Sequence, residues 1–120
     1  MSLFIRPVAG ALFLAVAAAT AVHAHAHLIK SEPGVDATVS APHELVLHFS
    51  EQLEGAFSGA TVKNAKGATI SGKATVDAGD KKIMRVPLKP DGGGTYKVNW
   101  HALSVDTHKT QGSFSFTVKP

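Results

Sequence analysis

Apolar and polar residues alternate in several short runs of this 120-residue chain. The clearest runs are ELVLHFS at 44–50, TYKVNWH at 95–101 and SFSFTV at 113–118. Successive side chains of a β-strand point to opposite faces, so each run would have one apolar face and one polar face as a strand. After the first 24 residues, no stretch has the 3.6-residue apolar periodicity of an amphipathic helix. The alternation predicts an all-β protein.

Turn residues separate these runs at intervals typical of an antiparallel β domain. Further strands are predicted at 28–31, 73–76 and 81–88, together with a hairpin over 59–70 that turns near 64–67. This makes about seven short strands, and in a single layer one of their apolar faces would remain in water. We therefore expect a small antiparallel two-sheet sandwich of the immunoglobulin-like type.

Residues 1–24 have the layout of a secretory signal peptide. Arg6 is the only charged residue, a long apolar block follows, and small residues suitable for a signal peptidase come last. The block is shorter than the roughly 20 residues that span a bilayer, which argues against a retained membrane anchor. Two cleavage positions fit the small-x-small rule, one before His25 and one before His27, and we favour the first. The mature protein is then residues 25–120, which suits one small domain.

Composition narrows the classes of protein to which this chain can belong. It has no cysteine, which excludes disulfide bonds, thiolate metal sites and thiol redox chemistry. Twelve basic and nine acidic residues give a formal net charge of +3, and these residues are scattered along the chain. Such a mild balance does not suggest a nucleic-acid partner. We expect an exported protein of a bacterial periplasm, whose stability comes from its apolar core.

Three histidines alternate with small residues where the leader meets the domain, in the stretch AVHAHAHLIK at 21–30. Cleavage before His25 would make this histidine the first residue, with a free amine and an imidazole that form a bidentate nitrogen chelate. A second arrangement is also open. With His27 at position three, the terminal amine, two backbone amides and one imidazole can surround Cu(II) or Ni(II) in a square plane.

Asp106 and His108 lie two residues apart in the stretch SVDTHKTQG at 104–112. In an extended segment their side chains would project from the same side and present a carboxylate and an imidazole together. Alone this spacing is a weak indication of a metal site, because a polar loop is the simpler explanation. Together with His25 it gives three nitrogen donors and one oxygen donor, a set that suits Cu(II) and, through imidazole, Zn(II). Met84 is the only methionine after the leader, so a soft Cu(I) site is not expected.

Five motifs in this sequence, taken in order, resemble the CopC (PcoC-type) family of periplasmic copper-resistance proteins. They are HAHL at 25–28, HFSE at 48–51, FSGA at 57–60, GTYKVNW at 94–100 and SVDTH at 104–108. The resemblance covers essentially the whole chain after the leader, and the ordered combination is far more specific than any one motif. It implies a cupredoxin-like or immunoglobulin-like β-sandwich that binds copper in the periplasm.

The resemblance also implies which residues bind the metal. The family's Cu(II) site, carried over to this sequence, consists of His25, through its amine and imidazole, together with Asp106 and His108. Members with a second, Cu(I) site have a methionine-rich loop in mid-chain, whereas residues 62–79 contain no methionine here. We therefore expect a Cu(II)-only member that binds one Cu(II) per chain.

The leading functional hypothesis is a protein that sequesters or carries Cu(II) in copper resistance or homeostasis. Its expected partner is an inner-membrane copper transporter or another periplasmic copper protein. The alternative is a copper-dependent oxidative enzyme, since an N-terminal histidine and a second histidine also form the histidine brace of such enzymes. We expect no enzyme, because the small domain leaves little room for a substrate platform and a carboxylate would occupy a coordination position. A metal-free interaction domain is the third possibility.

The remaining histidines and the single tryptophan have simpler interpretations. His43 follows a proline and is expected in a turn, and His48 is expected to be solvated or locally paired on the polar face of its strand. His101 shares a strand with Trp100 and lies near the candidate ligand segment in sequence, so it could orient a ligand, although this is not the favoured interpretation. Trp100 is expected in the core rather than in the site.

Overall fold

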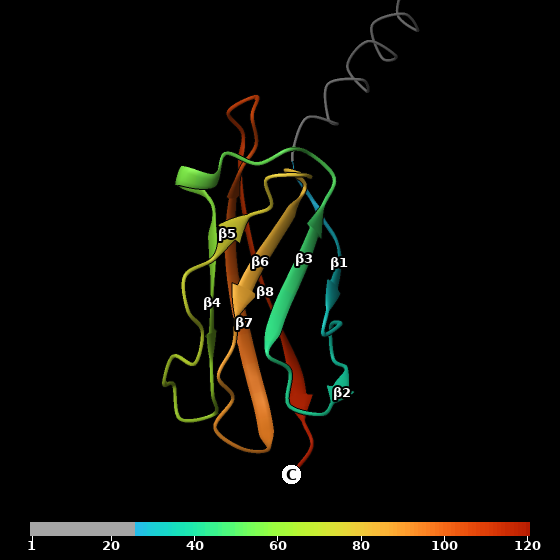
Figure 1. Cartoon of the computed structure of the whole chain (residues 1–120), viewed down its shortest axis with the longest axis vertical. Coiled ribbons are helices and arrows are strands. Elements are labelled where there is room, and N and C mark those ends of the chain that lie inside the picture. The colour runs from blue at the N-terminus through green and yellow to red at the C-terminus, as the bar shows by residue number, and fades with distance from the viewer. Residues whose placement is uncertain (1–25) are drawn as a thin grey trace, which may run out of the picture.

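The computed structural model describes residues 26–120, in which two four-stranded β-sheets pack face to face (Figure 1). The expected signal peptide and His25 lie outside these residues. The first sheet has the strand order β1 (Leu28–Glu32), β3 (Glu44–Phe49), β6 (Ile83–Pro87), β5 (Thr75–Val76). The second has the order β2 (Thr38–Val39), β8 (Lys109–Val118), β7 (Gly94–Leu103), β4 (Gly59–Lys63). A single 3-10 turn, η3 (Gly55–Phe57), is the helical element of the described chain, which contains no helix able to span a membrane.

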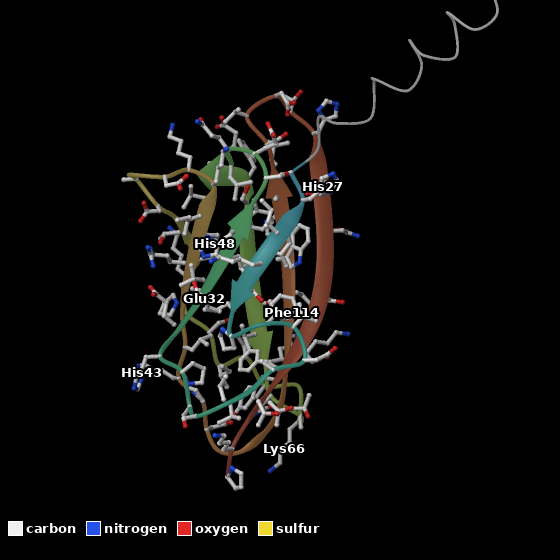
Figure 2. All side chains as sticks on the ribbon, turned by 90° about the vertical axis from the view of Figure 1, so that its right-hand side faces the viewer. His27, Glu32, His43, His48, Lys66 and Phe114 are labelled. Carbon is white, nitrogen blue, oxygen red and sulfur yellow. The ribbon has the colours of Figure 1, made fainter. Side chains whose placement is uncertain are left out.

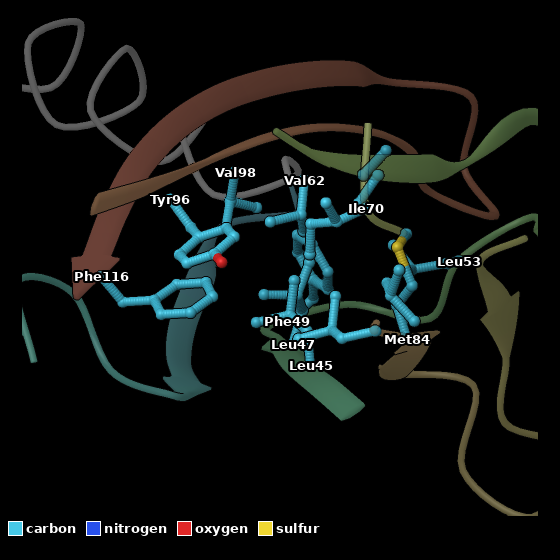
Figure 3. Close-up of a cluster of buried hydrophobic side chains, with 14 of the residues drawn as sticks. Leu45, Leu47, Phe49, Leu53, Val62, Ile70, Met84, Tyr96, Val98 and Phe116 are labelled. Carbon is cyan, nitrogen blue, oxygen red and sulfur yellow. The ribbon is translucent and has the colours of Figure 1, made fainter. Parts of the chain in front are cut away.

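The alternating runs form the strands because their apolar faces meet between the two sheets. Leu45, Leu47 and Phe49 of β3 are at most 2% exposed, and Tyr96 and Val98 of β7 are buried to the same extent. Figure 3 shows these side chains converging from the two layers into one cluster. The predicted all-β sandwich is therefore confirmed, and most apolar residues on the inner faces of the three alternating runs are buried in its core.

Strands β7 and β8 form a long antiparallel hairpin that determines where the ligand segment lies. Their pairing runs from Gly94 opposite Val118 to Leu103 opposite Lys109. Residues 104–108 therefore connect the two strands at one end of the sandwich, and the C-terminus lies at the other end (Figure 1). All neighbouring strands are antiparallel except β2 and β8, which are parallel.

Three details differ from the strand predictions. β2 was not predicted, and β8 begins at Lys109 rather than at residue 113. The hairpin over 59–70 has its predicted turn, where Gly67 has a φ of 85° and Asn64 Oδ1 accepts two backbone N–H groups. Its second arm, however, forms only an isolated bridge, because the chain then leaves β4 to join the other sheet.

Trp100 is half-buried and packs against the core, so its predicted core position is confirmed only in part. Its ring meets the ring of Phe49 edge to face, with centroids 5.2 Å apart and an interplanar angle of 71°. Gly112 lies opposite Trp100 in β8, and a Cβ atom added there would come within 2.6 Å of the indole. The glycine thus leaves the space that the large ring occupies.

Two aspartates outside the core hold neighbouring segments together. Arg85 of β6 donates to Asp77 over 3.2 Å and to Glu44 of β3 over 3.3 Å. This bond from Arg85 holds the pKa of Asp77 below its usual value. At the far end of the sandwich, Asp91 accepts from Asn64 and Tyr96, and these bonds lower the pKa of Asp91 in the same way.

Candidate metal centre

Residues 104–108 form a tight turn at the tip of the β7–β8 hairpin. Thr107 N donates to the carbonyl of Ser104 over 2.8 Å, and Ser104 N donates to the carbonyl of His108 over 3.0 Å. Thr107 has a φ of 72°, in the left-handed region. The expectation of an extended segment is therefore wrong, because the chain must reverse direction within these few residues.

The turn nevertheless brings the two predicted ligands of this segment together. Nδ1 of His108 lies 3.4 Å from Oδ1 of Asp106, and each side chain is 45% exposed. A carboxylate oxygen and an imidazole nitrogen thus face solvent side by side at the end of the sandwich. Their proximity results from the reversal of the backbone and not from strand alternation.

Ser104 organises this turn from below. Ser104 is fully buried, and its hydroxyl donates to Oδ1 of Asp106. Oγ of Ser104 also accepts a hydrogen bond of 3.2 Å from the backbone N–H of His108. Sequence reasoning did not single out this serine, because one serine in a polar turn has no distinguishing pattern. One buried hydroxyl therefore contacts both residues that present the donors.

The carboxylate of Asp106 is held in its charged form. The hydrogen bond from Ser104 is the main cause that lowers its pKa, and the neighbouring His108 acts in the same direction, while partial burial opposes them. An ionised carboxylate is the form that binds a metal ion. The electrostatics of the tip thus favour cation binding.

The start of the described chain is tied to the same end of the sandwich. Ala26 is fully buried, and its carbonyl accepts a hydrogen bond of 2.9 Å from the hydroxyl of Thr110, two residues beyond His108. His27 N donates to Ser50 Oγ over 2.8 Å, and Ser50 N donates to the carbonyl of His27 over 2.9 Å. Figure 2 shows His27 at this end of the molecule. His25, the third predicted ligand, is bonded directly to Ala26 but lies outside the described residues.

Within residues 26–120, no group of three or more His, Asp or Glu side chains could hold a metal by itself. Asp106 and His108 supply two donors, one oxygen and one nitrogen, of the kinds that suit Cu(II) or Zn(II). A metal ion bound at this pair would need further donors from outside the described residues or from solvent.

The three-residue arrangement through His27 is less compatible with this geometry. It requires the backbone nitrogens of Ala26 and His27 to lose their protons and bind the metal. The nitrogen of His27 already donates its hydrogen to Ser50, and Ala26 is buried against the sandwich. These contacts would have to be given up for the arrangement through His27 to form.

Three further histidines of the described residues are not assigned as ligands. Nε2 of His48 is 3.1 Å from Oε1 of Glu32 on the outer face of β1 and β3, which confirms the local pairing expected for it (Figure 2). His43 is exposed in the segment before β3. The ring of His101 covers Gly59 on β4, where its Cε1 would be only 3.0 Å from an added Cβ.

Comparison with known proteins identifies the family. The model of the CopC domain matches residues 28–119. This chain belongs to the CopC family. Among its relatives, "Copper resistance protein C" of Escherichia coli is 38% identical over 114 residues, which cover 88% of this chain and 90% of that protein. "Protein YobA" of Escherichia coli strain K12 is 44% identical over 104 residues, which cover 82% of each chain.

Solved structures of the CopC family share the architecture. CopC from Methylosinus trichosporium OB3b superposes with a TM-score of 0.75 at 27% identity, over 80% of this chain and 95% of that one. PcoC from Escherichia coli, described as a methionine-rich copper resistance protein, superposes with a TM-score of 0.70 at 39% identity, over 80% and 100%. This chain has only Met1 and Met84. The family resemblance seen in the sequence is therefore confirmed.

Proposed function

We propose that this protein binds one Cu(II) ion at the hairpin tip and sequesters or carries it in copper resistance or homeostasis. The observation that supports this most directly is the convergence of Asp106 and His108, 3.4 Å apart, beside the point where Ala26 is anchored. Relatives named as copper resistance proteins match most of their length to this chain. No reaction is needed beyond the exchange of ligands.

The proposed ligands are the amine and imidazole of His25, the carboxylate of Asp106 and the imidazole of His108. They form a set of three nitrogens and one oxygen, which suits the tetragonal coordination of Cu(II). This proposal includes export to the periplasm and cleavage before His25, because only cleavage makes the backbone nitrogen of that residue a basic amine. The mass of the exported protein identifies its first residue.

The exposure of the tip suits transfer of the ion to a second protein. Both described donors are 45% exposed, so an incoming ligand can approach without unfolding the domain. We propose an inner-membrane copper transporter or another periplasmic copper protein as the acceptor. A relative named "Copper transport protein CutJ" of Bacillus subtilis is 32% identical over 98 residues, although these cover only 18% of that longer protein.

The first test removes the donors of the tip. In a protein that begins at His25, Asp106→Ala and His108→Ala should each lower Cu(II) affinity at least about tenfold, or about 1.4 kcal/mol. Affinity is measured by competition with a Cu(II) chelator, and the copper spectrum should change as well. His43→Ala, an exposed histidine elsewhere, is the matched control and should have no effect. Absence of stoichiometric Cu(II) binding would instead indicate a metal-free interaction domain.

The second test concerns the terminal amine. A protein with one methionine added before His25 should fold normally, since additions at chain ends are well tolerated. It should nevertheless bind Cu(II) at least about tenfold more weakly than the protein that begins at His25. Equal affinities would mean that the amine is not a ligand.

The alternative function, a copper-dependent oxidative enzyme, requires an open coordination position on the copper ion, whereas a carrier does not. Asp106 lies beside His108, where it can occupy such a position. We propose a binding protein without catalytic turnover. Oxygen consumption with ascorbate and the copper-loaded protein distinguishes the two, because sustained turnover would support the enzyme.

A further inference from the structure

We infer that Thr110, with the help of Ser50, is a positioning residue that places the N-terminal ligand of the copper site. This inference rests on the proposed function, in which His25 binds copper. Neither Thr110 nor Ser50 is a ligand in that site. Both contact the two residues that follow His25, and both do so through hydrogen bonds to the backbone.

Three hydrogen bonds hold two consecutive residues at the start of the domain. Thr110 donates to the carbonyl of Ala26, and Ser50 both accepts from and donates to the backbone of His27. These bonds connect the chain to β8 and to the segment after β3 at the same time. The side chain of Ala26 is completely buried, which removes the remaining freedom of this segment.

The bond from Thr110 is the one that relates the N-terminus to the hairpin tip. Thr110 belongs to β8, which begins directly after His108, so its hydroxyl holds Ala26 beside the strand that leads out of the ligand turn. Consecutive Cα atoms are about 3.8 Å apart, so a residue bonded to Ala26 starts from a fixed point near that turn. A chelate assembled from two distant segments binds more tightly when both are held in place before the metal arrives.

The direct test replaces Thr110 by valine, which has nearly the same shape and no hydroxyl. In a protein beginning at His25, Thr110→Val should weaken Cu(II) binding about tenfold, which is a common effect of replacing a residue that orients a metal ligand. Thr110→Ser keeps the hydroxyl and should restore most of the affinity. Thr117→Val is the matched control, because Thr117 lies on the same strand and its hydroxyl makes no hydrogen bond within residues 26–120.

The same substitution in the methionine-extended protein identifies the ligand through which Thr110 acts. If Thr110 positions His25, Thr110→Val should cause no further loss of Cu(II) affinity in this protein, because the added methionine has already removed the terminal chelate. An equal loss in both backgrounds would overturn the inference, because Thr110 would then act on Asp106 and His108 directly. If the extension alone changes nothing, the proposed amine ligand fails. If only the extension weakens binding, the inference fails alone.

A metal-free measurement completes the test. In the apo protein, Thr110→Val should speed hydrogen exchange at the backbone amide of His27, because the start of the chain opens more often when one of its anchors is lost. Exchange in the core of β7 should stay unchanged, which shows that the fold is intact. Unaltered exchange at His27 would contradict a role of Thr110 in fixing this segment.

Discussion

At the residue scale, Ser104 shows how one buried hydroxyl can order an exposed site. Most buried polar groups in proteins are hydrogen-bonded, and the hydroxyl of Ser104 is, with Asp106 as acceptor and the amide of His108 as donor. The carboxylate of Asp106 is therefore oriented and kept ionised by a residue that is itself fully buried. The spacing of the two proposed ligands alone does not determine this arrangement.

Ser104→Ala should loosen the turn. It leaves the amide of His108 without its acceptor and removes the donor to Asp106, so the unfolding free energy should fall by about 1 kcal/mol. Cu(II) affinity should fall about tenfold, and hydrogen exchange at the His108 amide should accelerate. Ser113→Ala, at an exposed position of β8, is the control. Wild-type exchange at His108 in the Ser104 variant would contradict this role.

The proximity of Asp106 and His108 could be predicted from the sequence, but the path of the backbone between them could not. Alternation along a strand gave the right neighbours for the wrong reason, since the segment is a turn with Thr107 in the left-handed region. Thr110 and Ser50 could not be predicted at all. Their partners are 84 and 23 residues away, and a hydroxyl-to-backbone bond over such a distance leaves no local pattern.

At the scale of elements, the β7–β8 hairpin is paired without interruption, but only one half of it has a clear apolar alternation in sequence. Its lower half alternates clearly, because Tyr96, Val98 and Phe116 point into the core between the sheets. The first residues of β8 are polar and exposed or half-buried, so they have no alternating signal, and the start of the strand was missed. β2 has only two residues and depends entirely on pairing with the end of β8.

Gly112→Ala should disturb the packing of this hairpin. The new Cβ would lie 2.6 Å from the ring of Trp100, which is too close, so the ring or the backbone of β8 must shift and the edge-to-face contact with Phe49 is disturbed. Such overpacking commonly costs about 1–3 kcal/mol of stability. Chemical denaturation measures the loss, and the fluorescence of the single tryptophan reports the displacement. Gly34→Ala is the control, since its nearest contact would be an ordinary 3.7 Å.

At the scale of the whole molecule, the sandwich depends on aspartates in their charged form. Asp77 and Asp91 both have pKa values below the usual 3.8, owing chiefly to hydrogen bonds from Arg85 and Asn64, respectively. Their stabilisation is complete above the pKa of the unfolded chain. It is lost as the pH falls towards the lower pKa of the folded protein, because the unfolded state then binds protons first.

Acid denaturation tests this dependence. The unfolding free energy should decline as the pH is lowered from about 5 to about 3. Asp77→Asn should be less stable than the wild type at neutral pH, since it weakens the contact with Arg85, and its stability should fall less steeply in acid. Parallel curves for the two proteins would show that Asp77 does not contribute to the acid sensitivity.

The opposite positions of the hairpin tip and the C-terminus determine how the protein can be handled. β8 starts beside the ligand turn and ends at the far pole, where Lys119 and Pro120 are exposed (Figure 1). A purification tag placed before His25 would remove the free amine of the proposed site, whereas a tag or surface linkage after Pro120 would leave it intact. Immobilised through its last residue, the molecule would point the hairpin tip, with its proposed copper site, outward, and a sensor chip prepared in this way would present every copy to a metal donor or acceptor in the same orientation.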